Sequence, residues 1–212
     1  MKTYPGMKNQ PYPKAQEQWQ DEQGCQELIA LWGDLAEKAM EEALVGRLVA
    51  ELPAHKTVVD LGCGSGRVIP CLPEFARYRG FDTSPHLLAA AQTTYAADRR
   101  CTFTAQDLFA GAPYKRPVDV LLSIGVTRHY TDPYAVARQI MATWPAKFYV
   151  FDFLHYAGPA VDLLNARCLA SDALAAELAS LGLVVARDDQ PLIDGMLVTY
   201  VVIRPDYQSV MV

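Results

Sequence analysis

The feature that most constrains this chain is a short apolar run that leads directly into alternating glycines, at residues 58–67 (VVDLGCGSGR). Residues 57–61 are mostly β-branched or apolar, which predicts a short buried strand. The glycines then let the chain turn tightly and let a ligand approach bare backbone, since no Cβ stands in the way. They occupy Gly62, Gly64 and Gly66. A helix is expected next, starting late or running irregularly because Pro70 and Pro73 interrupt it. A strand, a glycine turn and a helix N-terminus together predict a nucleotide-binding cradle.

The spacing of the glycines indicates which kind of nucleotide would bind. A dinucleotide fingerprint needs a third glycine three residues after the second, where this chain has Arg67. Instead, Asp60 precedes three glycines that stand at two-residue intervals. This pattern resembles motif I of the class I S-adenosylmethionine-dependent methyltransferases.

The rest of the chain alternates strand-like and helix-like segments. Further strands are expected at about 78–82, 101–104, 118–124, 148–151, 183–186 and 197–203, and helices near 84–95, 132–141 and 168–181. Five strands alternate with helices, and the last two pair as an antiparallel hairpin. The predicted fold is therefore α/β and Rossmann-like, a seven-stranded, mostly parallel sheet with helices on both faces and an antiparallel last strand. Over roughly residues 40–204 this order is similar to the seven-stranded methyltransferase fold.

Residues 1–40 are expected to form an N-terminal segment and helix, and residues 41–212 the S-adenosylmethionine-binding domain. The first 18 residues are rich in Pro, Gln, Lys and Tyr. They are either a disordered leader, which the composition favours, or a lid whose aromatic residues, including Tyr4 and Trp19, close over a small substrate. From Asp21 to about Leu52 the apolar spacing is helical, and Gly33 and Gly46 would divide this region into two helices.

Composition and charge narrow the class of partner. The net charge of −5 makes nucleic acid a poor substrate, since no basic surface is indicated. No apolar run is long enough to span a membrane, and the first residues lack a signal-peptide core. The five cysteines show no metal-type repeat and are read as reduced thiols, which favours a cytoplasmic protein. The oligomeric state is left open.

The resemblance implies a set of cofactor-binding positions. Asp82 follows Asp60 by 22 residues, where an acid accepts hydrogen bonds from ribose hydroxyls. Asp60 would lie near the methionine end of the cofactor, and Ser123 beside the sulfonium. The full implied set is Asp60, Gly62, Cys63, Gly64, Gly66, Asp82, Thr83, Gln106, Asp107, Leu108 and Ser123, with Gln106, Asp107 and Leu108 at the adenine.

The sequence constrains the residues that would bind and activate the methyl acceptor less strongly. Histidines that follow the fourth and fifth strands, His129 and His155, are candidates for a general base, because ligands bind beyond the carboxyl ends of parallel strands. Each could equally be a surface or structural imidazole, and for His155 the structural alternative is favoured. Tyr130 shares the His129 loop and is a further catalytic candidate. The residues expected to touch the substrate are Tyr4, Trp19, Arg128 and Tyr156.

Absent motifs narrow the reaction. The catechol-type methyltransferases hold a divalent metal with an Asp-Asn pair after the fifth strand, whereas here Phe153 follows Asp152, so no metal is expected. The runs typical of the DNA-amino and arginine-methylating enzymes are also missing. The prediction is a metal-independent enzyme that moves a methyl group from S-adenosylmethionine to an O, N, S or C atom of a small molecule and releases S-adenosylhomocysteine. The alternatives are another reaction on the same cofactor, or a non-catalytic, cofactor-binding partner subunit.

Overall fold

The computed structural model describes residues 20–34, 36–52, 56–156, 161–162, 167–191 and 197–205. In these parts of the chain the strands are β1 Lys56–Leu61, β2 Phe75–Asp82, β3 Cys101–Ala105, β4 Val118–Ser123, β5 Ala146–Tyr156, β6 Val161–Asp162, β7 Arg167–Ala170, β8 Leu183–Pro191 and β9 Leu197–Arg204. The α-helices are α2 Glu22–Asp34, α3 Ala36–Ala50, α4 Pro85–Thr94, α5 Pro133–Thr143 and α6 Ser171–Leu181. Single 3₁₀ turns are η1 Ile69–Cys71, η2 Leu108–Ala110 and η3 Thr127–His129.

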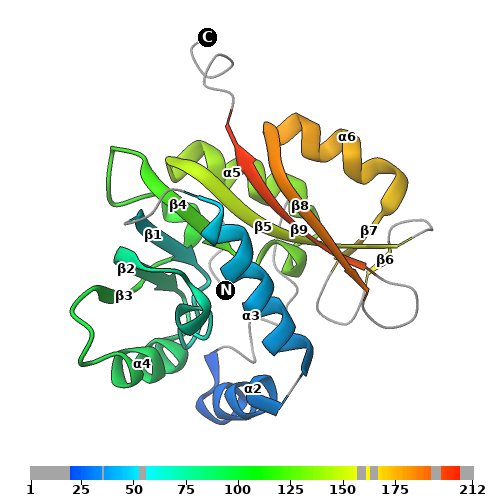
Figure 1. Cartoon of the computed structure of the whole chain (residues 1–212). Helices are drawn as coiled ribbons and strands as arrows, with labels where there is room; N and C mark the ends of the chain where they lie inside the picture. Colours follow the sequence, from blue (N-terminus) through cyan, green and yellow to red (C-terminus); the bar gives the residue numbers. More distant parts are fainter. Residues whose placement is uncertain are drawn as a thin grey trace.

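All the strands join one sheet, in the order β3-β2-β1-β4-β5-β7-β6 (Figure 1). The pairs β1–β2, β1–β4, β2–β3, β4–β5 and β5–β7 are parallel. Strand β9 lies antiparallel along the other edge of β5, and β8 pairs antiparallel with β9. The mostly parallel sheet with an antiparallel last strand is therefore confirmed, as are the helices on both faces.

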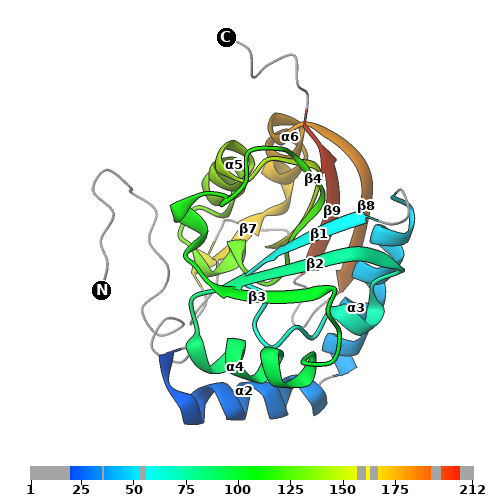
Figure 2. The ribbon, with the colours of Figure 1, turned by 90° about the vertical axis from the view of Figure 1, so that its left-hand side faces the viewer.

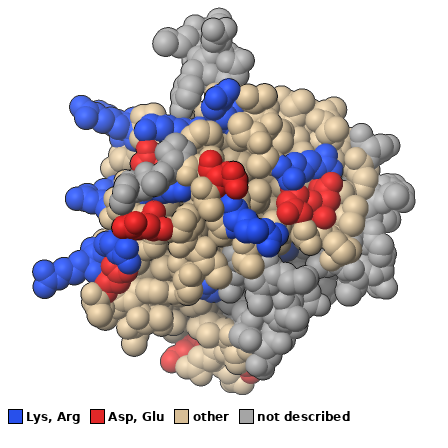
Figure 3. Space-filling view, viewed as in Figure 1, with Lys and Arg blue, Asp and Glu red and all other residues tan. Residues whose placement is uncertain are grey.

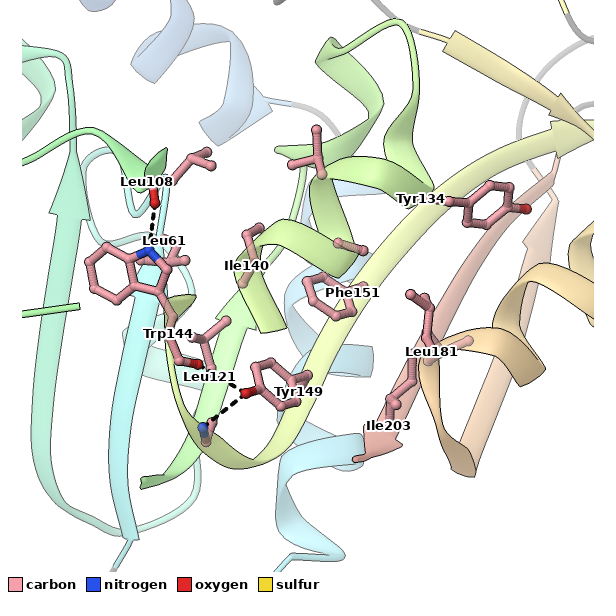
Figure 4. Close-up of a cluster of buried hydrophobic side chains, with 14 of the residues drawn as sticks. Leu61, Leu108, Leu121, Tyr134, Ile140, Trp144, Tyr149, Phe151, Leu181 and Ile203 are labelled. Carbon is pink, nitrogen blue, oxygen red and sulfur yellow. Dashed lines mark hydrogen bonds between the residues drawn. The ribbon is translucent and has the colours of Figure 1, made fainter. Parts of the chain in front are cut away.

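Helix α3 covers one face of the sheet, and α5 and α6 cover the other (Figures 1 and 2). Under α5 and α6 the largest buried side chain is Trp144, whose indole N–H donates to the Leu108 carbonyl at 2.5 Å (Figure 4). Beside it, the Tyr149 hydroxyl donates to the Trp144 carbonyl at 2.9 Å (Figure 4). The indole N–H of Trp144 and the hydroxyl of Tyr149 are thus satisfied inside the protein, as buried polar groups require.

Helix boundaries follow the local signals closely. Ser84 accepts a hydrogen bond from the Leu87 N–H at 3.2 Å and Pro85 is the first residue of α4, as predicted. Asp132 caps α5 in the same way, through the Ala135 N–H at 2.9 Å. The chain divides into α2 and α3 close to Gly33, but Gly46 lies inside α3. A Cβ at Gly46 would be 2.2 Å from the Cys71 carbonyl oxygen, so this glycine serves close packing rather than a helix end.

Three predicted elements differ in the structure. After the glycines only the turn η1 forms instead of a helix, because Pro70 lies within it and Pro73 follows. Strand β5 runs on to Tyr156 rather than ending at Phe151, since β9 and β7 supply hydrogen-bonding partners for its second half. The segment Arg167–Ala170, expected to lie mostly in a helix, is strand β7, and α6 begins at Ser171.

Candidate functional site

The carboxyl ends of β1, β2 and β4 meet at one edge of the sheet, and the predicted site lies there. Leu61 pairs with Phe81, and the Phe81 carbonyl accepts hydrogen bonds from the N–H groups of Gly62 at 2.7 Å and Cys63 at 3.2 Å. The first turn after β1 is therefore bound directly to the end of β2.

The loop that follows β1, residues 62–66, depends on its glycines. Gly62, Gly64 and Gly66 have φ values of 72°, 52° and 77°, a region that side chains with a Cβ rarely adopt. A Cβ on Gly62 would also lie 2.3 Å from Val126 Cγ2, and one on Gly66 would lie 2.9 Å from the Tyr95 ring. Glycine is thus required at Gly62 and Gly66 for two reasons, the positive φ of the backbone and the close approach of neighbouring side chains.

Asp82 joins two loops at this edge. Its carboxylate accepts the Gly64 N–H and the Ser84 N–H, each at 2.8 Å. Burial raises the pKa of Asp82, and these backbone hydrogen bonds act in the opposite direction. Next to it, the Thr83 carbonyl accepts from the Gln20 side chain at 3.2 Å. Asp82, the predicted ribose acid, therefore lies against the glycine loop.

Asp60 has a partner that the sequence reading missed. The buried Tyr78 hydroxyl donates to the buried Asp60 carboxylate at 2.5 Å. Burial raises the pKa of Asp60 to about 7, while the tyrosine bond and Arg67 lower it. Cys63 is buried as well, and burial raises the pKa of its thiol. Tyr78 follows Asp60 by 18 residues, and only the parallel pairing of β1 with β2 brings it there.

The residues after β3 form the adjoining wall. The Gln106 N–H donates to the Asp82 carbonyl at 2.9 Å, and its side chain donates to the Gly111 carbonyl at 2.5 Å. Asp107 caps η2 by accepting the Phe109 N–H at 2.8 Å. Leu108 is buried and its carbonyl accepts from Trp144. The predicted adenine residues are thus next to Asp82.

Ser123 ends β4 and is fully buried, and its hydroxyl has no hydrogen-bond partner among the described residues. The loop from 124 to 130 follows, including η3. Asp152 of β5 accepts the Gly125 N–H at 2.7 Å and forms an ion pair with Arg128 at 3.5 Å. Arg128, expected to touch a substrate, is therefore bound to the protein itself.

Residues 58–144 of the chain match the protein family described as "Methyltransferase domain". Residues 58–144 therefore form a methyltransferase domain, in agreement with the S-adenosylmethionine-dependent family that the sequence resembles. No curated protein matches the chain by sequence.

Solved structures share the fold of this methyltransferase domain at low sequence identity. The N-methyltransferase NodS from Bradyrhizobium japonicum, in complex with S-adenosylhomocysteine, is 12% identical with a TM-score of 0.66, covering 92% of this chain and 98% of NodS. The magnesium protoporphyrin IX methyltransferase ChlM from Synechocystis, with bound S-adenosylmethionine, is 17% identical with a TM-score of 0.59, covering 91% and 92%. The 4+2 cyclase SpnF is 15% identical with a TM-score of 0.61, covering 77% and 81%.

The predicted base candidates of the methyltransferase domain lie in different surroundings. His129 is half-buried at the end of η3, and Tyr130 is buried with its ring edge-on to Phe109, 5.6 Å between centroids. His155 was expected in a loop after the fifth strand, but it lies inside β5, buried. Its Nδ1 is 2.7 Å from Ser171 Oγ and its Nε2 is 2.5 Å from Thr199 Oγ1.

The ring nitrogens of His155 have fixed roles. Thr199 donates its hydroxyl proton to Asp189, so it accepts from His155 Nε2–H, which leaves Nδ1 to accept from Ser171. Burial lowers the pKa of His155. This arrangement favours the structural alternative. Of the other predicted acceptor residues, Tyr4, Trp19 and the side chain of Tyr156 lie outside the described residues.

The site fits the cofactor that the family uses. The Ser123 hydroxyl at the end of β4 is a buried polar group that lacks a hydrogen-bond partner among the described residues, so a bound group can supply one. A carboxylate has about four acceptor positions, and the backbone N–H groups of Gly64, Ser84 and Thr83 do not fill all those of Asp82, so it can still accept from a ribose hydroxyl. Across the described ranges no group of three His, Cys, Asp or Glu side chains is placed to hold a metal ion. Within those same ranges, no helix combines the length and apolar character needed to cross a bilayer.

Proposed function

We propose that this protein transfers a methyl group from S-adenosylmethionine to a nucleophilic O, N, S or C atom of a small molecule, without a metal ion. The observation that carries the proposal is the 2.8 Å hydrogen bond from the Gly64 N–H to Asp82, which joins the glycine loop to the predicted ribose acid. When bound, the cofactor supplies an electrophilic methyl group on a sulfonium. The protein would align the acceptor with that group and exclude water.

Each part of the cofactor has a proposed set of residues. Asp82 would accept hydrogen bonds from the ribose hydroxyls, with Thr83 beside it. Asp60, Cys63 and the glycines would hold the methionine end, where the buried carboxylate suits an ammonium group. Gln106, Asp107 and Leu108 would hold the adenine, and Ser123 would lie beside the sulfonium. Their positions around the carboxyl ends of β1 to β4 support this assignment.

Several observations support a reaction that needs no metal ion and an acceptor that is a small molecule. Asp152, at the position where the catechol-type enzymes place a metal-binding Asp, already accepts the Gly125 N–H and forms an ion pair with Arg128. On the face in Figure 3, Lys and Arg side chains are interspersed with Asp and Glu rather than gathered in one basic stripe, which suits a small molecule better than nucleic acid. His129, at the end of η3, remains the proposed base.

The start of the described chain supports a role for residues 1–40 near the site. Gln20 donates to the Thr83 carbonyl at 3.2 Å, and the Cys25 thiol lies 3.3 Å from the Ser84 hydroxyl. Helix α2 thus begins beside the turn that carries Asp82. We propose that the segment before it, with Tyr4 and Trp19, covers the substrate. The thiols of the described cysteines, Cys25, Cys63, Cys71 and Cys101, agree with a cytoplasmic setting.

The test is a screen of metabolite extracts with S-adenosylmethionine labelled in its methyl group. A labelled acceptor whose mass rises by one methyl, formed by the wild type and not by Asp82→Ala, supports methyl transfer. Because the fold alone does not fix the reaction, as the cyclase SpnF illustrates, two other results have meaning. Cofactor-dependent conversion without label transfer indicates another reaction, and tight binding without any turnover indicates a cofactor-binding partner subunit.

A further inference from the structure

Asp152 lies where β4 stops and β5 continues. Ser123, the last residue of β4, pairs with Phe151, so Asp152 stands directly beside the first residues of the loop that follows β4. Asp152 is fully buried and Thr127 is fully buried. A buried carboxylate is costly unless every acceptor position finds a donor or a cation, so its contacts define what this residue does.

Three of these contacts fix the loop. Asp152 Oδ1 accepts the Gly125 N–H at 2.7 Å, and the Asp152 main-chain carbonyl accepts the Thr127 hydroxyl at 2.8 Å. Its Oδ2 forms the 3.5 Å ion pair with Arg128, whose side chain is only 17% exposed. One residue of β5 therefore binds three of the four residues from 125 to 128.

Gly125 makes this arrangement sterically feasible. Its φ is +73°, and a Cβ there would lie 3.1 Å from Arg128 Nη2. The guanidinium therefore folds back over the glycine toward Asp152. A larger residue at 125 would both strain the backbone and crowd the arginine.

The one residue of this stretch that does not bind Asp152, Val126, points at the glycine loop. Its Cγ2 is 2.3 Å from the position that a Cβ on Gly62 would take. The Val126 carbonyl accepts the His129 N–H at 3.1 Å, so the same loop also carries the proposed base. The loop held by Asp152 thus links the glycine loop on one side to His129 on the other.

We infer that Asp152 is a positioning residue for methyl transfer, and this inference rests on the proposed function of the site. It holds residues 125–128 against the glycine loop. It thereby sets the shape of the site for the methionine end of the cofactor and the position of His129. The sequence reading considered Asp152 only as a metal ligand and discarded it. Its role comes instead from the hydrogen bond, the ion pair and the main-chain contact that it makes.

The experiment compares Asp152→Ala, Asp152→Asn and a control on the same strand, Val150→Ala. Val150 is fully buried in the core, and its truncation destabilises the protein while leaving in place the three Asp152 contacts to residues 125–128. Asparagine keeps an acceptor for the Gly125 N–H and loses the charge opposite Arg128. The readouts are thermal unfolding, amide hydrogen exchange of residues 124–130 without ligand, and the affinity for S-adenosylhomocysteine by calorimetry.

Asp152→Ala should speed exchange at the Gly125 and His129 amides and weaken S-adenosylhomocysteine by about 10- to 100-fold, the value of a lost buried hydrogen bond. Asp152→Asn should restore most of that affinity, while Val150→Ala should lower the unfolding temperature and leave the affinity unchanged. Unchanged loop exchange in Asp152→Ala, or equal affinity losses in Asp152→Ala and Val150→Ala, overturns the inference and leaves the proposed function intact. A wild-type protein that does not bind S-adenosylhomocysteine overturns both.

Discussion

The Tyr78 hydroxyl donates a 2.5 Å hydrogen bond to Oδ2 of Asp60, and both residues are buried where β1 and β2 lie side by side. Burial raises the pKa of Asp60 from 3.8 to about 7, and the tyrosine opposes that rise. Because the folded pKa lies above the unfolded one, the ligand-free protein gains stability from neutral Asp60 at low pH. That gain is fully present below about pH 4 and is lost as the pH rises through about 7.

A cofactor ammonium beside Asp60 would favour the ionised carboxylate, so we expect S-adenosylhomocysteine to bind more tightly as the pH rises toward about 7, with release of a proton. Tyr78→Phe should move the onset of tight binding to higher pH, since the bond that lowers the Asp60 pKa is gone. Calorimetry in two buffers of different ionisation enthalpy measures both effects. In Asp60→Asn only the ligand's own titration should remain, and an identical pH profile in wild type and Asp60→Asn would exclude this linkage.

Asp82→Ala should weaken the cofactor by about 1.5–3 kcal/mol, or roughly 10- to 100-fold, because charge-assisted hydrogen bonds to the ribose are lost. A suitable control is Asp98→Ala, since Asp98 also accepts a neighbouring backbone N–H, that of Arg100 at 3.0 Å, in the turn before β3. Calorimetry should show a loss of affinity in the first variant alone. Equal affinity in a folded Asp82→Ala protein would remove Asp82 from the ribose site.

Gly62→Ala should destabilise the protein and weaken the cofactor, because its φ is +72° and its Cβ would meet Val126 at 2.3 Å. Gly111→Ala is a matched control, since it has φ +77° but its nearest neighbours are 3.7 Å from the new Cβ. Gly111, with ψ 169°, lies in an extended positive-φ region that is essentially restricted to glycine, so Gly111→Ala should show the backbone cost alone, about 1–3 kcal/mol in thermal unfolding. The stability that Gly62→Ala loses beyond this backbone cost should return when Val126→Ala is added. No recovery would mean that the Val126 contact is not what restricts this position.

His129→Ala should lower turnover by about 10²–10⁴-fold, the usual loss for a general base, once an acceptor is known. S-adenosylhomocysteine affinity should hardly change. The wild-type rate should fall at acidic pH, because a protonated imidazole cannot accept the proton of the acceptor. His86→Ala, in the first turn of α4, is the control. Normal turnover with the same pH profile in His129→Ala would mean that alignment alone drives the reaction.

Excess chelator should leave the rate of methyl transfer intact. The expectation comes from Asp152, whose carboxylate is bound to Gly125 and Arg128. The test is to measure the rate of methyl transfer with and without chelator. An activity abolished by chelator and restored by magnesium would contradict the metal-independent proposal.

The amino-acid sequence by itself determined the features that depend on neighbours a few residues away. The alternating glycines specify the left-handed turn after β1, because only glycine adopts those φ values at no steric cost. Ser84 with Pro85, and Asp132, specify where α4 and α5 begin, since a cap and its N–H partner are three residues apart. The order of the main strands and helices followed from the same local patterns.

Only the tertiary structure decided the features that join distant parts of the chain. The extension of β5 and the strand β7 exist because β9 and β5 offer them hydrogen bonds, and no local propensity encodes that pairing. The burial that raises the pKa of Asp60, and the contact of Asp152 with Gly125, 27 residues away, likewise require the folded sheet. Desolvation and long-range hydrogen bonds depend on three-dimensional neighbours, so the sequence could name these carboxylates but could not assign what they do.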